Sequence, residues 1–130
     1  MSDFGDIEDI LEDFLVEGME LLDVMDNELV ELEKDPGNSN LLNQIFRKFH
    51  TIKGGAGFIS ATEMVNLCHT TENLFDQLRT GRLVVTQDMM DTILDATAAV
   101  RQMFESLQSR IMPAPPDQNL VARLKAALQE

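Results

Sequence analysis

The sequence predicts an all-α protein, an antiparallel four-helix bundle with a fifth C-terminal helix or tether. Apolar residues recur every three or four positions along most of the chain, and no alternating pattern typical of strands competes with them. Helix-breaking segments divide these runs. With 130 residues, 44% of them hydrophobic, the chain is long enough for one packed core. Trp and Tyr are absent, so we expect this core to consist of Leu, Ile, Val, Met and Phe.

The first predicted helix covers residues 6–34, in which the apolar positions follow a helical period. These positions are Ile7, Ile10, Leu11, Phe14, Leu15, Leu22, Met25, Leu29 and Leu32. The segment 35–40, DPGNSN, ends this helix because its proline and glycine disfavour helical structure. Ser39 or Asn40 is then expected to cap the second helix.

The second helix is expected over residues 40–59, and a short SAT link at 60–62 separates it from the third. Ser60 followed by Glu63 fits a capping box, which predicts that the third helix starts there. The third helix is expected to reach about Thr80, because a glycine follows that residue. Such short links predict that consecutive helices are antiparallel neighbours.

The fourth helix is expected over residues 86–110, and the segment 113–117, PAPPD, interrupts the helical pattern. A last amphipathic stretch covers 119–129. We therefore expect residues 1–112 to form the bundle domain, and 113–130 to form a Pro-rich linker with a short C-terminal helix. The pattern leaves open whether this last helix packs on the bundle.

The net charge of −13 excludes several classes of partner. Phosphate backbones are bound mainly by Lys and Arg, and the chain has 10 of these against 23 acidic residues, so we expect no nucleic-acid partner. No apolar run is long enough to insert in a membrane. Cys68 is the single cysteine, and its place on the inward face of the third helix predicts a packed, unreactive thiol. The acidic N-terminus does not resemble a signal peptide, which predicts a cytoplasmic protein.

His50 lies at the edge of the apolar stripe of the second helix, roughly 110° from its centre, so we expect it to be partly exposed. Lys53 and Gly54 follow at i+3 and i+4 and flank it. A glycine inside a helix costs about 1 kcal/mol relative to alanine, and residues 54–57 contain three of them. Either the helix ends here with a glycine C-cap, or the glycines leave space beside the ring. The periodicity that continues to Ile59 favours the second interpretation.

The third helix carries His69, Glu72 and Asp76 along one margin, at i, i+3 and i+7. In an antiparallel hairpin this margin can face the one that carries His50 and Lys53. Two histidines, a lysine and a glutamate are then expected to meet at the edge of the bundle.

Such a cluster suits a histidine that accepts a phosphoryl group. An exposed neutral imidazole is a nucleophile, and a carboxylate that accepts the proton of one ring nitrogen leaves the lone pair of the other facing outward. Glu72 is the candidate for that carboxylate, and His69 is expected to support the cluster. Lys53 would attract an incoming phosphoryl group, while Gly54 gives a partner protein access to the His50 ring.

The stretch HTIKGGAGF, residues 50–58, resembles the His-x-x-Lys-Gly motif of histidine phosphotransfer (HPt) domains. It is most similar to the version at the N-terminus of chemotaxis histidine kinases, the CheA family. The similarity extends over nearly the whole chain. Residues 7–38, IEDILEDFLVEGMELLDVMDNELVELEKDPGN, resemble the first helix and turn of that family, and residues 68–83, CHTTENLFDQLRTGRL, resemble its third helix.

The resemblance implies that His50 takes the γ-phosphoryl group of ATP from the ATP-binding domain of a kinase, commonly in the other subunit of a dimer. His50 would then pass the group to an aspartate in the receiver domain of a response regulator. The family's conserved lysine, small residue, third-helix histidine and glutamate fall on Lys53, Gly54, His69 and Glu72, and the glutamate is taken to hold the tautomer of the phosphorylated ring.

The resemblance also implies that this domain binds no cofactor, because ATP and Mg²⁺ are used by the catalytic domain of the parent histidine protein kinase. The family's ATP-binding, dimerisation and coupling domains are missing from these residues. We therefore expect the fragment alone not to be an enzyme.

Three alternatives remain open. The chain could be an HPt module of a hybrid sensor kinase or a stand-alone phosphorelay shuttle; the long first helix and the C-terminal extension argue against this. It could be a non-catalytic helical adaptor in which both histidines are incidental. A metal site formed by His50, His69 and Glu72 is the third alternative, and the neighbouring Lys53 disfavours it.

Overall fold

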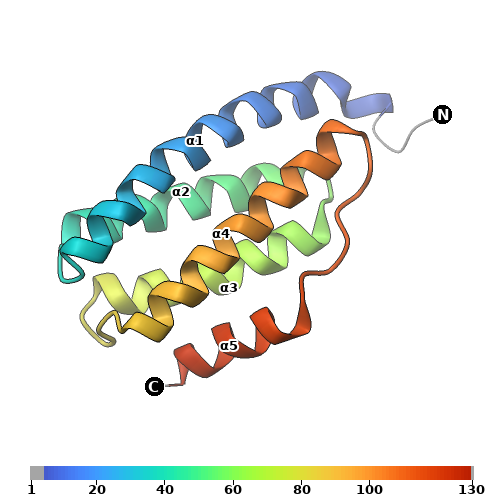
Figure 1. The fold of residues 1–130 in the computed structure, drawn as a ribbon. Coiled ribbons are helices and arrows are strands. Elements are labelled where there is room, and N and C mark those ends of the chain that lie inside the picture. The colour runs from blue at the N-terminus through green and yellow to red at the C-terminus, as the bar shows by residue number, and fades with distance from the viewer. Residues whose placement is uncertain (1–4, 130) are drawn as a thin grey trace.

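The computed structural model describes residues 5–129 of the chain. Residues 1–4 of the predicted domain 1–112, and residue 130 of the predicted C-terminal segment, lie outside the described residues. A 3₁₀ turn at Gly5–Ile7 leads into five α-helices within the described range (Figure 1). The helices are α1 (Glu8–Lys34), α2 (Ser39–Phe58), α3 (Thr62–Arg79), α4 (Gln87–Gln108) and α5 (Gln118–Leu128).

The first four helices form an antiparallel bundle, which confirms the predicted fold class (Figure 1). Helices α1 and α3 each pack against both α2 and α4, so the apolar faces of all four meet in one core. The rings of Phe49, Phe75 and Phe104 are fully buried in it. Burial of these faces against one another, rather than helix propensity alone, stabilises helices of this kind in water.

The start of α2 lies one residue earlier than expected, and that of α4 lies one residue later, at Gln87. The Asn38 side chain accepts a hydrogen bond from the backbone N–H three positions later, so Asn38 is the cap rather than Ser39 or Asn40. Thr86 caps α4, where its hydroxyl oxygen accepts the N–H of Met89 at 3.1 Å. Each cap satisfies a backbone donor that the first helical turn leaves unpaired.

The expected capping box at the start of α3 is wrong. Ser60 has a φ of +58° and belongs to the end of α2. The N–H of Ala61 donates to the carbonyl of Ala56 at 2.9 Å, and that of Ser60 donates to Gly57 at 3.2 Å, which is a Schellman motif. Ala61 is the residue before α3, and no side chain caps it. The Ser60–Glu63 pattern therefore does not form a capping box, because Ser60 is part of the turn that ends α2.

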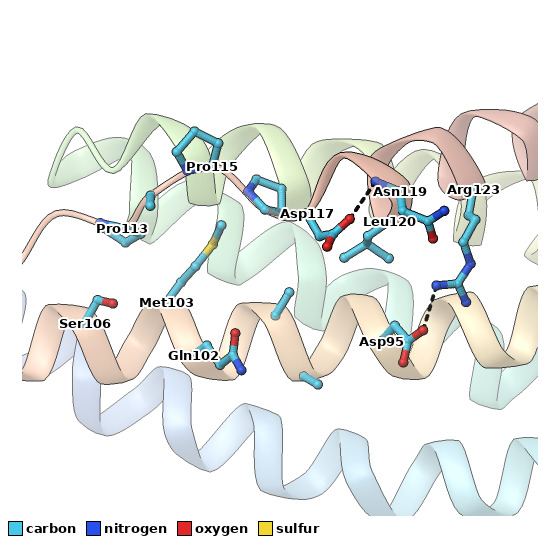
Figure 2. Close-up of a pocket in the computed structure, with 14 residues that line it drawn as sticks. Asp95, Gln102, Met103, Ser106, Pro113, Pro115, Asp117, Asn119, Leu120 and Arg123 are labelled. Carbon is cyan, nitrogen blue, oxygen red and sulfur yellow. Dashed lines mark hydrogen bonds and ion pairs between the residues drawn. The ribbon is translucent and has the colours of Figure 1, made fainter.

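The last helix packs on the bundle, against α3 and α4 (Figure 1). Its buried residues are Leu120, Leu124 and Ala127. Figure 2 shows the Pro-rich segment and α5 along α4, with the Arg123 guanidinium 2.7 Å from the Asp95 carboxylate. The Asp117 side chain accepts the N–H of Asn119 at 2.7 Å and caps α5. The packing question that the sequence left open is thus answered, whereas the predicted boundary between 1–112 and 113–130 stays a prediction.

Of the nine apolar positions expected to face inward in the first helix, seven are buried and Ile7 is partly buried. Ile10, expected to face inward, is 48% exposed. The next residue, Leu11, is fully buried. Among the described residues, no helix combines the length and the apolar character that crossing a bilayer needs.

Candidate functional site

Helix α2 continues through its three glycines to Phe58, so the interpretation that the helix ends at Gly54 is wrong. The glycines differ in what surrounds them. A Cβ on Gly55 would lie 2.4 Å from the ring of Phe14, so this glycine permits close packing of α1 on α2. A Cβ on Gly54 or Gly57 would meet nothing within 4 Å. These two therefore have no packing reason within the described part of the chain, and the space beside them is open.

His50 projects from α2 toward solvent, and its side chain is 65% exposed. Its Nδ1 atom is hydrogen bonded to Oε2 of Glu72 on α3. A carboxylate can only accept, so Nδ1 carries the proton in this pair. The other ring nitrogen, Nε2, has no hydrogen-bond partner among residues 5–129, which leaves its lone pair available at the surface.

Glu72 is buried, with 7% of its side chain exposed, instead of lying at an open margin as its helix position suggested. Its Oε1 accepts a hydrogen bond from Lys53 Nζ at 2.6 Å. Burial acts to raise the pKa of Glu72, but the hydrogen bonds and charges of Lys53 and His50 outweigh it and hold that pKa below its usual range. Glu72 is therefore an ionised carboxylate whose two oxygens are hydrogen bonded, one to His50 and the other to Lys53.

Lys53 joins this cluster as expected, but its ammonium group is bonded to Glu72. With 24% of its side chain exposed, it still borders the surface near His50. Its charge thus stabilises the ionised form of Glu72 directly. The expected contact of Lys53 with a phosphoryl group stays a prediction.

His69 makes no hydrogen bond to His50, Lys53 or Glu72 and remains exposed. It lies on the wall of a cleft between α3 and α5, with Lys125 among the other residues of that wall. The helix that covers this side of α3 is α5, whose position could not be predicted from the pattern of α3 alone. The four-residue cluster expected from the sequence is therefore a hydrogen-bonded group of three.

The metal site that was weighed as the third alternative is not supported by the described residues. Within the described range, no three or more His, Cys, Asp or Glu side chains are grouped so that they could hold a metal ion. The pair of His50 and Glu72 lacks the third ligand that His69 was to provide.

Two residues were missed as site residues, one that contacts His50 and one that contacts the first. The ring of Phe46, one turn earlier on α2, is stacked with the imidazole of His50, and the guanidinium of Arg79 from α3 lies 4.0 Å from the Phe46 centroid. The i, i+4 spacing of Phe46 and His50 was a signal that could have found the first. Arg79 is the last residue of α3, and only the register of α3 against α2 reveals its place.

Cys68 lies one turn before Glu72 on α3 but does not take part in the site. The thiol is fully buried, and burial together with the charge of Glu72 raises the pKa of Cys68 to about 12. At neutral pH it is a packed thiol without nucleophilic character, as the sequence predicted.

Chemically, the cluster presents one nucleophile. The exposed imidazole of His50 has its proton fixed on Nδ1 by a buried anion, and its Nε2 is left free. One turn later on α2, a Cβ on Gly54 would meet nothing within 4 Å, so the backbone there is open as well. The Glu72 carboxylate can also stabilise a positive charge that develops on the ring. Because 65% of the His50 side chain is exposed, a group carried by another protein surface can reach its ring.

Known proteins are similar to this chain in sequence and in fold. The model of the Hpt domain family matches residues 9–110. The sensor histidine kinase CheAY of Helicobacter pylori is 36% identical over 103 residues, which are 79% of this chain and 13% of that protein. The chemotaxis protein CheA of Halobacterium salinarum is 38% identical over 103 residues, 79% of this chain and 15% of that protein. The chain thus spans about a seventh of the length of these kinases.

Solved structures agree. The CheA phosphotransferase domain from Thermotoga maritima superposes with a TM-score of 0.74 at 35% identity, covering 80% of this chain and 99% of that one. The solution structure of the histidine phosphotransfer domain of CheA gives a TM-score of 0.82 at 31% identity, covering 93% and 90%. The phosphorylated P1 domain of CheA3 in complex with CheY6 from R. sphaeroides, at 20% identity and a TM-score of 0.82, shows the same fold. The chain therefore belongs to the Hpt domain family, among the phosphotransferase domains of CheA chemotaxis kinases.

Proposed function

We propose that His50 is a phosphoryl carrier between a CheA-type kinase and a response regulator. One observation carries this proposal: the imidazole is exposed, while its Nδ1 is held by a buried, ionised Glu72. The donor is ATP bound with Mg²⁺ by a kinase catalytic domain, and the acceptor is an aspartate of a receiver domain. In this proposal the ATP site belongs to the kinase domain and the acceptor aspartate to the receiver domain.

The reaction needs no proton transfer at His50. The lone pair of Nε2 attacks the γ-phosphorus of ATP, an N–P bond forms, and the P–O bond to ADP breaks with its electron pair going to ADP. The ring becomes positively charged, and because Nδ1 keeps its proton, the Glu72 carboxylate stabilises that charge. In the second step an aspartate oxygen attacks the phosphorus, and neutral His50 leaves with its electron pair.

Lys53 supports this scheme by keeping Glu72 ionised through their 2.6 Å hydrogen bond. A phosphoryl group carries negative charge, so it is repelled by the Glu72 carboxylate when it arrives at His50. The ammonium group of Lys53 reduces that repulsion. Gly54 is assigned to partner access, since nothing lies within 4 Å of the position its Cβ would take.

The choice of partners rests on the relatives. The matching relatives are named as a sensor histidine kinase, CheAY, and as a chemotaxis protein, CheA. A P1 domain of the same fold was crystallised, phosphorylated, in complex with CheY6. A protein that must meet both a kinase domain and a receiver domain needs an accessible acceptor atom. The 65% exposure of the His50 side chain meets that need.

The test is phosphorylation of the chain by ATP and the catalytic portion of a CheA-type kinase. We expect labelled phosphate that is lost in acid and kept in base, as a phosphohistidine requires. The variant His50→Gln should lose the label and keep its helical circular dichroism. His69→Gln is the matched control, because His69 is the other histidine of the chain and is expected to leave labelling unchanged.

Adding a receiver domain with Mg²⁺ should then remove the label from the chain and transfer it to the receiver. Label that persists in His50→Gln, or that disappears in His69→Gln, would contradict the assignment of the acceptor. Label that stays on the chain in the presence of several CheY-type receivers would contradict the second half of the proposal.

A further inference from the structure

We infer that Arg79 is a positioning residue for phosphotransfer, which acts on His50 through the ring of Phe46. This inference rests on the proposed function of His50 and adds a second constraint on its imidazole. Glu72, which itself accepts a hydrogen bond from Lys53, holds the Nδ1 atom from one side. The ring stack with Phe46 limits the same imidazole from the side of the preceding helical turn.

The rings of Phe46 and His50 lie nearly parallel. Their centroids are 6.5 Å apart with an interplanar angle of 17°, which is an offset stack between residues at i and i+4 of α2. A hydrogen bond to Nδ1 alone leaves the imidazole free to tilt about that bond. A flat neighbour one turn earlier reduces this freedom, so the direction of the Nε2 lone pair is defined more closely.

Arg79 holds the Phe46 ring in turn. Its guanidinium carbon is 4.0 Å from the ring centroid, the geometry of a cation–π contact. The guanidinium is itself fixed: Nε donates to Asp76 at 2.9 Å, and Nη1 donates to Asn43 on α2 at 3.2 Å. Arg79 thus links the C-terminal end of α3 to the part of α2 that precedes His50.

An alternative role for Arg79, whose side chain is exposed, is to attract an acidic surface of a partner protein directly. The two roles predict different kinetics. A positioning residue changes the rate at saturating partner concentration, whereas a docking residue changes the concentration of partner that is required. The contacts with Phe46, Asp76 and Asn43 occupy the guanidinium within this chain, which favours the positioning role.

The test compares four variants of the full chain: Arg79→Gln, Phe46→Leu, the double variant, and Arg82→Gln. Arg82 is the matched control, an exposed arginine three residues later that has no contact with Phe46 among the described interactions. Phosphorylation by the kinase catalytic portion is measured as kcat and KM with the chain as the varied substrate. In parallel, ¹⁵N NMR of the unphosphorylated chain reports how far the proton of His50 is confined to Nδ1.

We expect Arg79→Gln to lower kcat about two- to fivefold with KM unchanged, the size of effect given by an exposed cation–π contact. Arg82→Gln should match the wild type. Phe46→Leu should lower kcat at least as much, and adding Arg79→Gln to it should have no further effect, because Arg79 acts through the ring that is then absent. The fraction of His50 with its proton on Nδ1 should fall in parallel.

A raised KM with unchanged kcat in Arg79→Gln would overturn the inference in favour of a docking role. The inference would also be overturned if Arg79→Gln lowered kcat by the same factor in the wild type and in Phe46→Leu. If the wild type is not phosphorylated at all, the proposed function fails, and the NMR measurement still decides this inference. An unchanged His50 spectrum in Arg79→Gln would then overturn it.

Discussion

The Nδ1 atom of His50 on α2 is hydrogen bonded to the Glu72 carboxylate on α3, 22 residues away along the chain. The two ends of this bond lie in different surroundings, since the His50 side chain is 65% exposed and that of Glu72 is 7% exposed. A buried anion thus determines which nitrogen of a surface imidazole faces solvent. The hairpin of α2 and α3 is what brings the two residues together.

Replacing Glu72 with glutamine should slow phosphorylation of His50. The amide keeps the size of the side chain but removes the charge that fixes the Nδ1 proton and stabilises the positively charged ring. We expect the rate to fall about 10- to 100-fold, the range found when a carboxylate that orients a metal-bound histidine is removed. The measurement is the initial rate with ATP and the kinase catalytic portion, with Glu63→Gln on the same helix as the control. A wild-type rate in Glu72→Gln would remove Glu72 from the mechanism.

The stability of the domain should depend on the ionisation of Glu72 in acid. The pKa of Glu72 is lower in the folded chain than its ordinary value of 4.5, so the folded state binds the proton less tightly than the unfolded state. This contribution to the free energy of unfolding is complete above that ordinary value and is lost as the pH falls through the lowered one. Urea denaturation of the wild type and Glu72→Gln, from pH 6 to pH 3, measures it.

We expect the difference in free energy of unfolding between these two proteins to be largest near pH 6 and to shrink as the pH falls below about 4.5. A difference that stays constant over this range would mean that Glu72 has the same pKa in both states.

The glycines of α2 should respond differently to alanine. At Gly55 the new Cβ would lie 2.4 Å from the ring of Phe14, and overpacking of this kind typically costs about 1–3 kcal/mol. At Gly54 the methyl group has open space, so the better helix propensity of alanine should stabilise the protein by up to about 1 kcal/mol. Thermal and urea denaturation of both variants measure this difference.

Gly54→Ala should also raise the KM for phosphotransfer, because its methyl group stands one turn from His50 on the accessible side. A more stable Gly54→Ala with wild-type kinetics would show that partner access does not need this glycine. A Gly55→Ala variant as stable as Gly54→Ala would contradict the close packing of Phe14.

The thiol of Cys68 should not react in the native protein. Burial raises its pKa to about 12, so at pH 8 almost no thiolate is present, and the side chain is inaccessible to reagents. A chromogenic disulfide reagent at pH 8 should label the unfolded chain within minutes and the native chain only at the rate of unfolding. Rapid labelling of the native protein would contradict the packing of α3.

Most of the fold follows from local patterns, and the exceptions have physical reasons. Helical periodicity and the breaks at Pro36 and Gly81 located the helices to within about two residues, which is the usual uncertainty of helix ends. The pattern at Ser60 failed because one residue can serve the end of one helix or the start of the next. Only the hydrogen bond from Ala61 to Ala56 shows which use is made of it.

The position of a site residue was predictable where the period of a single helix determines it. It was less predictable where it depends on how two helices are aligned. The edge position of His50 and its neighbour Lys53 came from the period of α2 alone. The burial of Glu72 and the exclusion of His69 depend on which helices cover α3, including α5. Arg79 was missed for the same reason, because its contact with α2 depends on the register of the hairpin.

The central claim is that Nε2 of His50 carries the phosphoryl group while Nδ1 keeps its proton. The most direct measurement is NMR of the ¹⁵N-histidine-labelled chain after phosphorylation by ATP and the kinase catalytic portion. We expect ³¹P–¹⁵N coupling at Nε2 of His50, a proton retained on Nδ1, and no coupling at His69. Phosphorus bonded to Nδ1 of His50, or to either nitrogen of His69, would contradict the account.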